Sequence, residues 1–95
     1  MHAVVRSYSG QGVAELFDVI EQNTRDIEDL IRGVPGFVSY AIFRTADGGI
    51  SVTVCKDKAG TDESSRVAAE WIKGHMTGPV DPPTISEGSA ILQLS

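Results

Sequence analysis

The chain has 95 residues, of which 41% are hydrophobic and 22% are charged. This length and composition suit one hydrophobic core, so we expect a single domain over residues 1–95 and neither a second domain nor a disordered chain. The net charge is -5 and the eight Lys and Arg residues form no cluster, which argues against nucleic acid and membrane as partners. Because no apolar run could span a bilayer and the first ten residues lack the apolar core of a signal peptide, we expect a cytoplasmic protein.

The first third of the chain is predicted to form a strand and a long helix. Residues 2–8 are β-branched in the middle and precede a glycine-rich exit, which is typical of a strand. Residues 13–32 then carry apolar side chains at three- and four-residue steps, which predicts one amphipathic helix. Gly12 is a suitable N-cap, and Arg32 with Gly33 provides a suitable end.

Two strands are predicted to follow as a hairpin. Pro35 and Gly36 stop the helix, and residues 37–45 and 49–56 are rich in β-branched and aromatic side chains on either side of Asp47-Gly48. Cys55, the only cysteine, excludes an internal disulfide and a cysteine-cluster zinc site.

The last third is predicted to form a second helix and a final strand. Thr61 or Ser64 can cap a helix over residues 62–76, and the proline-rich segment 78–83 must be a loop. Residues 84–94 then form the fourth strand.

The predicted order βαββαβ indicates an α+β, ferredoxin-like fold, in which a four-stranded antiparallel sheet has two helices on one face. A hairpin centred on Asp47-Gly48 would pair Phe43 with Val52, and we expect that apolar pair to lie under the helices. The opposite face would then expose Val38, Tyr40 and Ile42. An apolar patch of this kind marks an interaction site, so a homodimer is expected.

Two segments carry a resemblance to a known family. "IRGVPGFVSYAIFRTADGGISVTVCKD" followed by "SRVAAEWIKGHM" resembles the dimeric α/β-barrel proteins, in particular the antibiotic biosynthesis monooxygenase-like group, over nearly the whole chain. The resemblance implies a homodimer in which two sheets pack face to face to close an α/β barrel. It also implies a cavity in each subunit for a small organic ligand.

The resemblance covers several activities, among them cofactor-independent oxygenases of phenols, haem-degrading enzymes and isomerases. We therefore expect a cofactor-independent monooxygenase or isomerase that acts on a small phenolic or enolisable compound. The alternative is a non-catalytic homodimeric ligand-binding or scaffold module.

Few residues could carry a reaction. His75 is the candidate catalytic base, and the candidate ligand-binding residues are Trp71, Tyr8, Tyr40 and Arg44. Arg6 and His2 are further polar groups that could lie near a cavity. Trp71 and His75 are one helical turn apart, so they could form a ring platform beside an imidazole, or Trp71 could fill the core while His75 ends the helix.

No metal site or cofactor is predicted. The chain has only two histidines, which are far apart in the sequence and form no metal-binding pair. Haem-degrading relatives use an Asn near the first strand, which this chain lacks, so haem is a lesser option.

Overall fold

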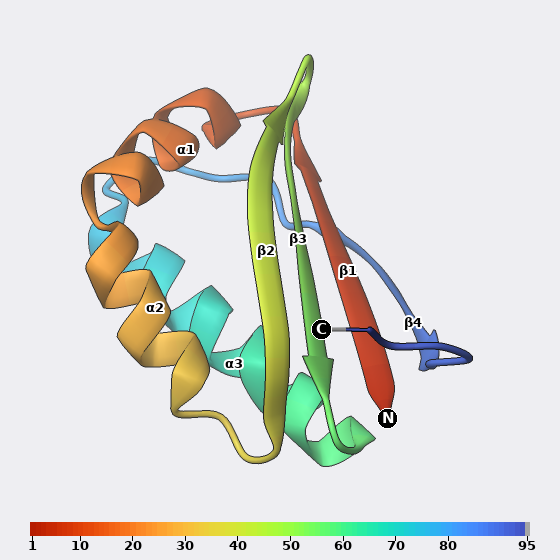
Figure 1. Ribbon diagram of the computed structural model, residues 1–95. Coiled ribbons are helices and arrows are strands. Elements are labelled where there is room, and N and C mark those ends of the chain that lie inside the picture. The colour runs from red at the N-terminus through yellow and green to blue at the C-terminus, as the bar shows by residue number, and fades with distance from the viewer. Residues whose placement is uncertain (95) are drawn as a thin grey trace.

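The computed structural model describes residues 1–94 and consists of one antiparallel sheet with helices on one of its faces (Figure 1). The elements are β1 His2–Ser9, α1 Val13–Gln22, α2 Thr24–Arg32, β2 Phe37–Thr45, β3 Gly48–Cys55, α3 Lys58–His75 and β4 Thr84–Ser89. The strand order is β2-β3-β1-β4. The predicted α+β, ferredoxin-like fold is confirmed, with three helices where two were predicted.

The helix predicted over residues 13–32 is broken at Asn23 into α1 and α2. Asn23 has φ -133° and ψ 33°, outside the helical range. Its side-chain amide donates a hydrogen bond of 2.7 Å to the carbonyl of Val19. Asn side chains offer such local bonds in competition with the helical ladder. The break allows α2 to run down the sheet beside β2 (Figure 1).

Helix α3 starts at Lys58, earlier than predicted, because Asp57 caps it. The Asp57 carboxylate accepts a hydrogen bond of 3.2 Å from the backbone N–H of Gly60. Thr61 and Ser64, the predicted caps, are instead buried inside the helix. None of the helices within residues 1–94 combines the length and the apolar character needed to cross a membrane.

Strands β2 and β3 form the predicted hairpin, but with a pairing shifted by two residues. Phe43 pairs with Ile50 rather than Val52, because the turn consists of Ala46 and Asp47. A shift of two residues preserves which side chains share a face of the sheet. The side chains that were predicted to share a face of the sheet therefore still do so in the observed register.

The predicted orientation of the sheet is wrong. Tyr40 and Ile42 of β2 face the helices and pack against the core, whereas Phe43 points away and is 50% exposed. Ser51 and Thr53 of β3 lie on the helix side with Tyr40 and Ile42. The face covered by the helices is thus the more polar of the two. From hydrophobicity alone, that face would be expected to lie toward solvent.

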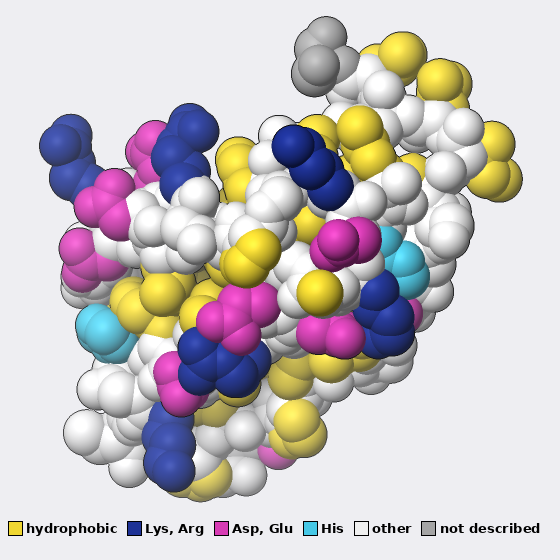
Figure 2. Space-filling view, turned by 90° about the horizontal axis from the view of Figure 1, so that it is seen from below, with side chains coloured by type: hydrophobic (Ala, Val, Ile, Leu, Met, Phe, Trp, Pro, Cys, Tyr) yellow, Lys and Arg dark blue, Asp and Glu magenta, His cyan; other side chains and the backbone are white. Residues whose placement is uncertain are grey.

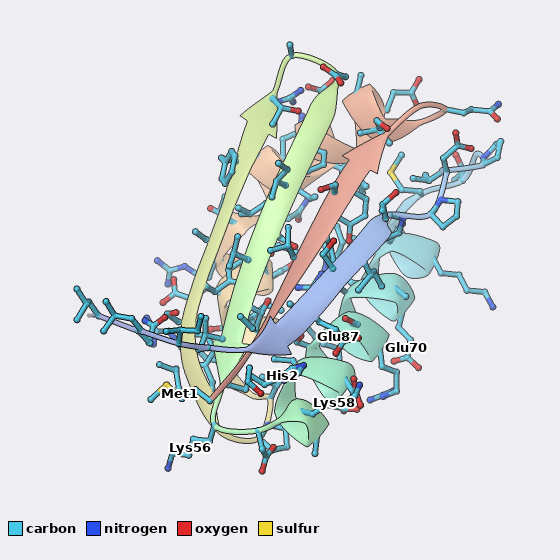
Figure 3. All side chains as sticks on the ribbon, turned by 90° about the vertical axis from the view of Figure 1, so that its right-hand side faces the viewer. Met1, His2, Lys56, Lys58, Glu70 and Glu87 are labelled. Carbon is cyan, nitrogen blue, oxygen red and sulfur yellow. The ribbon has the colours of Figure 1, made fainter. Side chains whose placement is uncertain are left out.

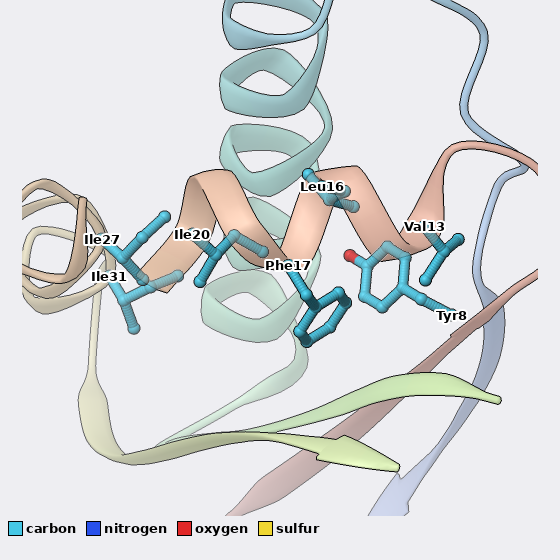
Figure 4. Close-up of a cluster of buried hydrophobic side chains, with 7 residues drawn as sticks. All are labelled: Tyr8, Val13, Leu16, Phe17, Ile20, Ile27 and Ile31. Carbon is cyan, nitrogen blue, oxygen red and sulfur yellow. The ribbon is translucent and has the colours of Figure 1, made fainter. Parts of the chain in front are cut away.

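The hydrophobic core lies between the sheet and the helices α1 and α2 (Figure 4). It consists of the apolar positions predicted for the long helix together with one tyrosine of β1: Tyr8, Val13, Leu16, Phe17, Ile20, Ile27 and Ile31. The rings of Tyr8 and Phe17 meet edge to face at 5.9 Å. Gly49 of β3 lets the Phe17 ring lie against the strand, because a Cβ there would come within 2.1 Å of that ring.

The face of the sheet away from the helices, which we call the open face, is mainly apolar (Figure 3). Its aligned apolar side chains come from β1, β2 and β3: Ala3, Val5, Ala41, Phe43, Ile50, Val52 and Val54. The polar side chains of Ser7 and Ser39 share this face. No helix among residues 1–94 covers this face (Figure 1).

The chain leaves the sheet after Ser89, so the fourth strand is shorter than the predicted 84–94. The backbone N–H of Ala90 donates to the carbonyl of Met1 at 2.9 Å, and the Gln93 amide donates to the Ser39 hydroxyl at 3.4 Å. Residues 90–94 therefore cross the sheet from β1 to β2 (Figure 3). Their apolar side chains project from the body of the molecule (Figure 2); those exposed are Ile91, Leu92 and Leu94.

Candidate functional site

The side chain of Arg6 is buried between the sheet and α3 and is only 1% exposed. Its guanidinium donates four hydrogen bonds, all to neutral hydroxyls: Nε to Ser51 at 3.1 Å, Nη2 to Thr53 at 2.7 Å, and Nη1 to Ser64 at 3.1 Å and Ser65 at 2.9 Å. The ion pairs found within residues 1–94 do not include Arg6. Because buried charges are normally paired, a buried cation held only by hydroxyls indicates a candidate site.

The strand register brings this cluster together. Arg6 of β1 is the cross-strand partner of Ser51, so both point to the helix side. Thr53 is two residues further along β3 and lies on the same face. Helix α3 closes the cluster from above with Ser64 and Ser65, and the Ser64 hydroxyl donates to the carbonyl of Thr61 at 2.7 Å.

Two tyrosines lie beside the Arg6 guanidinium. Burial raises the pKa of Tyr8, and the positive charge of Arg6 partly offsets this effect. Burial likewise raises the pKa of Tyr40, and Arg6 again acts in the opposite direction. Both phenols therefore keep their protons at neutral pH, and their hydroxyls can donate hydrogen bonds.

An open groove of about 350 Å³ lies between α2 and β2. Its walls are mainly apolar and its mouth carries an ion pair; the lining residues are Ile20, Thr24, Ile27, Glu28, Ile31, Arg32, Phe37, Tyr40, Ala41 and Ile42. A smaller hollow of about 20 Å³ adjoins it and shares Ile20, Ile27, Ile31, Tyr40 and Ile42 with it. The hollow extends inward to Arg6, Tyr8, Ser51 and Trp71. An apolar groove that ends at a few convergent polar groups is the usual form of a small-molecule site.

Comparison of the sequence with family models and with curated proteins found no match. Comparison with solved structures found matches over nearly the whole chain. The monooxygenase ActVA-Orf6 of Streptomyces coelicolor, solved in complex with nanaomycin D, is 24% identical over 98% of this chain and 92% of its own, with a TM-score of 0.62. The haem-degrader MhuD from Mycobacterium tuberculosis, solved with two haems in its active site, is 17% identical over the full length of both chains, with a TM-score of 0.67. NE2512 from Nitrosomonas europaea, a protein of unknown function, is 18% identical over 99% of this chain and 91% of its own, with a TM-score of 0.68.

The chain has the ferredoxin-like fold of the antibiotic biosynthesis monooxygenase-like proteins. The predicted resemblance is thus confirmed for the fold. At these identities it does not extend to a substrate or a reaction.

Trp71 and the two tyrosines meet at the hollow, whereas His75 does not line it. Trp71 is half-buried and packs against the core. The exposed His75 ring stacks on Trp71 with centroids 3.9 Å apart and an interplanar angle of 17°. His75 Nδ1 also lies 2.8 Å from the backbone carbonyl of Trp71, to which it donates in the matching tautomer.

Arg44 lies at the end of β2 and lines neither the groove nor the hollow. Its Nε lies 2.8 Å from Glu21 and its Nη2 lies 2.5 Å from Asp18, both on α1. Hydrogen bonds to Glu21 and Asp18 raise the pKa of Arg44. The side chain thus links α1 to the edge strand β2.

The residues that line the site do not fit haem well. Iron in haem proteins is held by His, Cys, Met or Tyr, and the groove and hollow offer only Tyr8 and Tyr40 from this set. Cys55 is buried and His75 stacks on Trp71 outside the lining. Residues 1–94 also bring together no group of three His, Cys, Asp or Glu side chains that could hold a metal ion.

The sequence indicated Arg6, Tyr8, Tyr40 and Trp71 as polar or aromatic groups near a cavity, but not the hydroxyls that hold Arg6. Ser51 and Thr53 alternate with valines, which is the usual pattern of a solvent-facing phase. The available signal was Arg6 itself, the only Arg or Lys of the first strand, directly after Val4 and Val5.

Proposed function

We propose that this protein binds a small phenolic or enolisable compound in the groove between α2 and β2 and oxygenates it without a cofactor. The observation that supports this proposal is the apolar groove that ends at Tyr8, Tyr40 and Trp71. An apolar wall accommodates rings, and the polar end fixes their orientation. The solved structures with this fold include monooxygenases, one of them in complex with nanaomycin D.

Such a reaction needs no external reductant when the substrate supplies the electrons. A substrate whose CH₂ group is activated by a phenol or carbonyl loses a proton to give an electron-rich anion, and O₂ adds to the carbon. The resulting hydroperoxide loses water and leaves a C=O group, so that CH₂ and O₂ become C=O and H₂O. The protein's part is to hold the ring and to favour the anion.

Oxygen uptake with anthrone-type compounds, which contain the activated CH₂ group, tests this function in the absence of added metal or cofactor. Thr24→Trp should fill the groove mouth and lower the rate at least about tenfold, since a blocked site cannot orient the ring. The neighbouring exposed Arg25 does not line the groove, so Arg25→Trp should keep the wild-type rate. Equal rates in both variants would contradict a reaction in this groove.

The alternative function is a non-catalytic ligand-binding module. The lining contains no histidine, and its only carboxylate, Glu28, lies at the mouth in an ion pair of 2.9 Å with Arg32. His75, the predicted base, does not line the hollow and stacks on Trp71, which does. Tight binding of these compounds without oxygen uptake would favour the module.

We also propose a homodimer that buries the open face. Phe43 is 50% exposed there beside Ile50 of β3, and Ala41, Val52 and Val5 form the next apolar row of the same face. The exposed Leu92 and Leu94 next to this face would add to the contact. A contiguous apolar face of this kind favours association, and a twofold interface uses the same face on both subunits.

A further inference from the structure

The Arg6 guanidinium has a charge that no acidic residue within the described range 1–94 neutralises by an ion pair. A guanidinium carries five N–H donors, and four of them bind the hydroxyls of Ser51, Thr53, Ser64 and Ser65. Hydroxyls satisfy the donors but leave the net charge in a poorly hydrated interior, where an unpaired ion is unfavourable. The interior around Arg6 therefore favours the entry of a negative group.

The two tyrosine hydroxyls provide donors on the open side of Arg6. Tyr8 and Tyr40 both line the hollow and stay protonated, because burial outweighs the effect of Arg6 on their pKa values. A nearby cation polarises a phenol and makes its O–H a stronger hydrogen-bond donor. Both hydroxyls can therefore donate to an oxygen in the hollow, with the cation behind them.

The small volume of the hollow limits which kind of anionic group can enter it. A volume of about 20 Å³ accommodates one water-sized group. The adjoining groove of about 350 Å³ accommodates a ring system. Only one guanidinium N–H remains, whereas bidentate binding of a carboxylate uses two. The volume of the hollow and the number of free hydrogen-bond donors thus match a single oxygen atom attached to a ring.

We infer that the inner end of the groove is an oxyanion subsite, in which Arg6, Tyr8 and Tyr40 bind a phenolic or enolic ligand through its ionised oxygen. This inference rests on the proposed use of the groove and adds the charge state of the ligand. It applies whether the bound compound is then oxygenated or only held. The subsite would favour the anion that reacts with oxygen.

The charge state can be measured with 4-nitrophenol, whose phenolate absorbs at longer wavelength than the phenol. The protein in excess is titrated with pH, and the absorbance gives the pKa of the bound compound. We expect this pKa to fall by about one unit or more, which corresponds to about tenfold tighter binding of the phenolate than of the phenol. In parallel, 4-nitroanisole, which has the same ring but no ionisable oxygen, measures binding to the groove alone.

Variants identify the side chains that cause the shift in the pKa of bound 4-nitrophenol. Arg6→Gln keeps two amide donors for the hydroxyls but removes the charge, so the bound pKa should return to its value in water or rise above it. Arg25→Gln removes an exposed arginine that does not line the groove and should leave the shift unchanged. If Arg6→Gln does not fold, the Tyr8→Phe and Tyr40→Phe double variant keeps the charge, removes both hydroxyls and should reduce the shift.

The outcomes separate this inference from the proposed function. Binding of 4-nitroanisole together with an unchanged or raised pKa of bound 4-nitrophenol would overturn the oxyanion subsite and leave the groove in place. Binding of neither compound would overturn both. A lowered pKa that persists in Arg6→Gln and in the double tyrosine variant would also overturn the assignment, because another group would then hold the anion.

Discussion

At the scale of single residues, Phe17 and Trp71 are aromatic side chains in different environments. Phe17 is 2% exposed and lies in the core against Tyr8, whereas Trp71 is half-buried and its ring is stacked by His75. Phe17→Ala should lower the free energy of unfolding by about 3 to 5 kcal/mol, the usual cost of a large core cavity. Trp71→Ala should lower it by about 1 to 3 kcal/mol, since water can enter part of the vacated space.

Urea denaturation followed by circular dichroism measures both values. Binding of 4-nitroanisole to the folded Trp71→Ala protein should weaken, because Trp71 lines the hollow. If Trp71→Ala cost as much stability as Phe17→Ala and left binding intact, Trp71 would belong to the core and not to the site.

Arg6 also shows why the sequence predicted which side chains share a face but not which face is covered. Period-two alternation groups Ser51 with Thr53, and the structure keeps that grouping. The more apolar set was expected under the helices, because hydrophobicity normally decides burial. In the structure the covered face instead carries the buried Arg6 guanidinium and its hydroxyl partners on β3 and α3. The residue pattern of one strand does not show such contacts between distant parts of the chain.

At the scale of elements, the approach of α3 to the sheet depends on Gly60. A Cβ at this position would lie 2.2 Å from the Pro35 carbonyl oxygen and 2.7 Å from the Cβ of Cys55. Gly60→Ala should therefore lower stability by about 1 to 3 kcal/mol, because the helix must move away from β3.

Gly74 in the same helix is the matched control. Apart from the backbone of α3 itself, no atom of residues 1–94 lies within 4 Å of a Cβ there, so Gly74→Ala should raise stability by about 0.5 to 1 kcal/mol through helix propensity. Thermal unfolding compares the two variants. Similar shifts of the same sign would show that α3 does not pack closely at Gly60.

The attachment of β4 should depend on pH through Glu87 (Figure 3). Hydrogen bonds from His2 at 2.9 Å and Lys58 at 3.2 Å lower the pKa of the Glu87 carboxyl. A group with a lowered folded pKa adds stability above its unfolded pKa and loses it as the pH falls through the folded value. The pairing of β4 with β1 should thus weaken in acid, below the usual Glu pKa of about 4.3.

Amide hydrogen exchange of β4, measured at near-neutral and acidic pH and corrected for intrinsic rates, tests this expectation. Glu87→Gln should show weaker protection at neutral pH and a smaller change in acid. The same pH response in wild type and Glu87→Gln would assign the effect to other groups.

The predicted elements were mostly correct, and their errors occur where one side chain outweighs the periodic pattern. The apolar spacing of residues 13–31 continues through Asn23 without a gap, so a single helix was predicted. The hydrogen bond from Asn23 to Val19 breaks it. Likewise the cap at Asp57 starts α3 earlier than Thr61 or Ser64 would. Caps and breaks of this kind are the least secure part of sequence interpretation.

At the scale of the whole molecule, the proposed homodimer predicts opposite results for two acidic substitutions. Val52 lies centrally on the open face, paired with Val5 and Ala41, so Val52→Asp should give a monomer. Ala14 is exposed on α1, and Ala14→Asp should keep the wild-type mass. Light scattering measures both. A wild-type mass in a folded Val52→Asp protein would show that another surface forms the contact.

The central claim is that the polar cluster around Arg6 is the inner end of a ligand site and not only a satisfied part of the interior. A crystal structure of the protein with 4-nitrophenol at neutral pH tests it most directly. We predict the ring between α2 and β2, with its oxygen within hydrogen-bond distance of the Tyr8 or Tyr40 hydroxyl. A compound bound only on the open face, or a ring in the groove with its oxygen directed to solvent, would contradict the account.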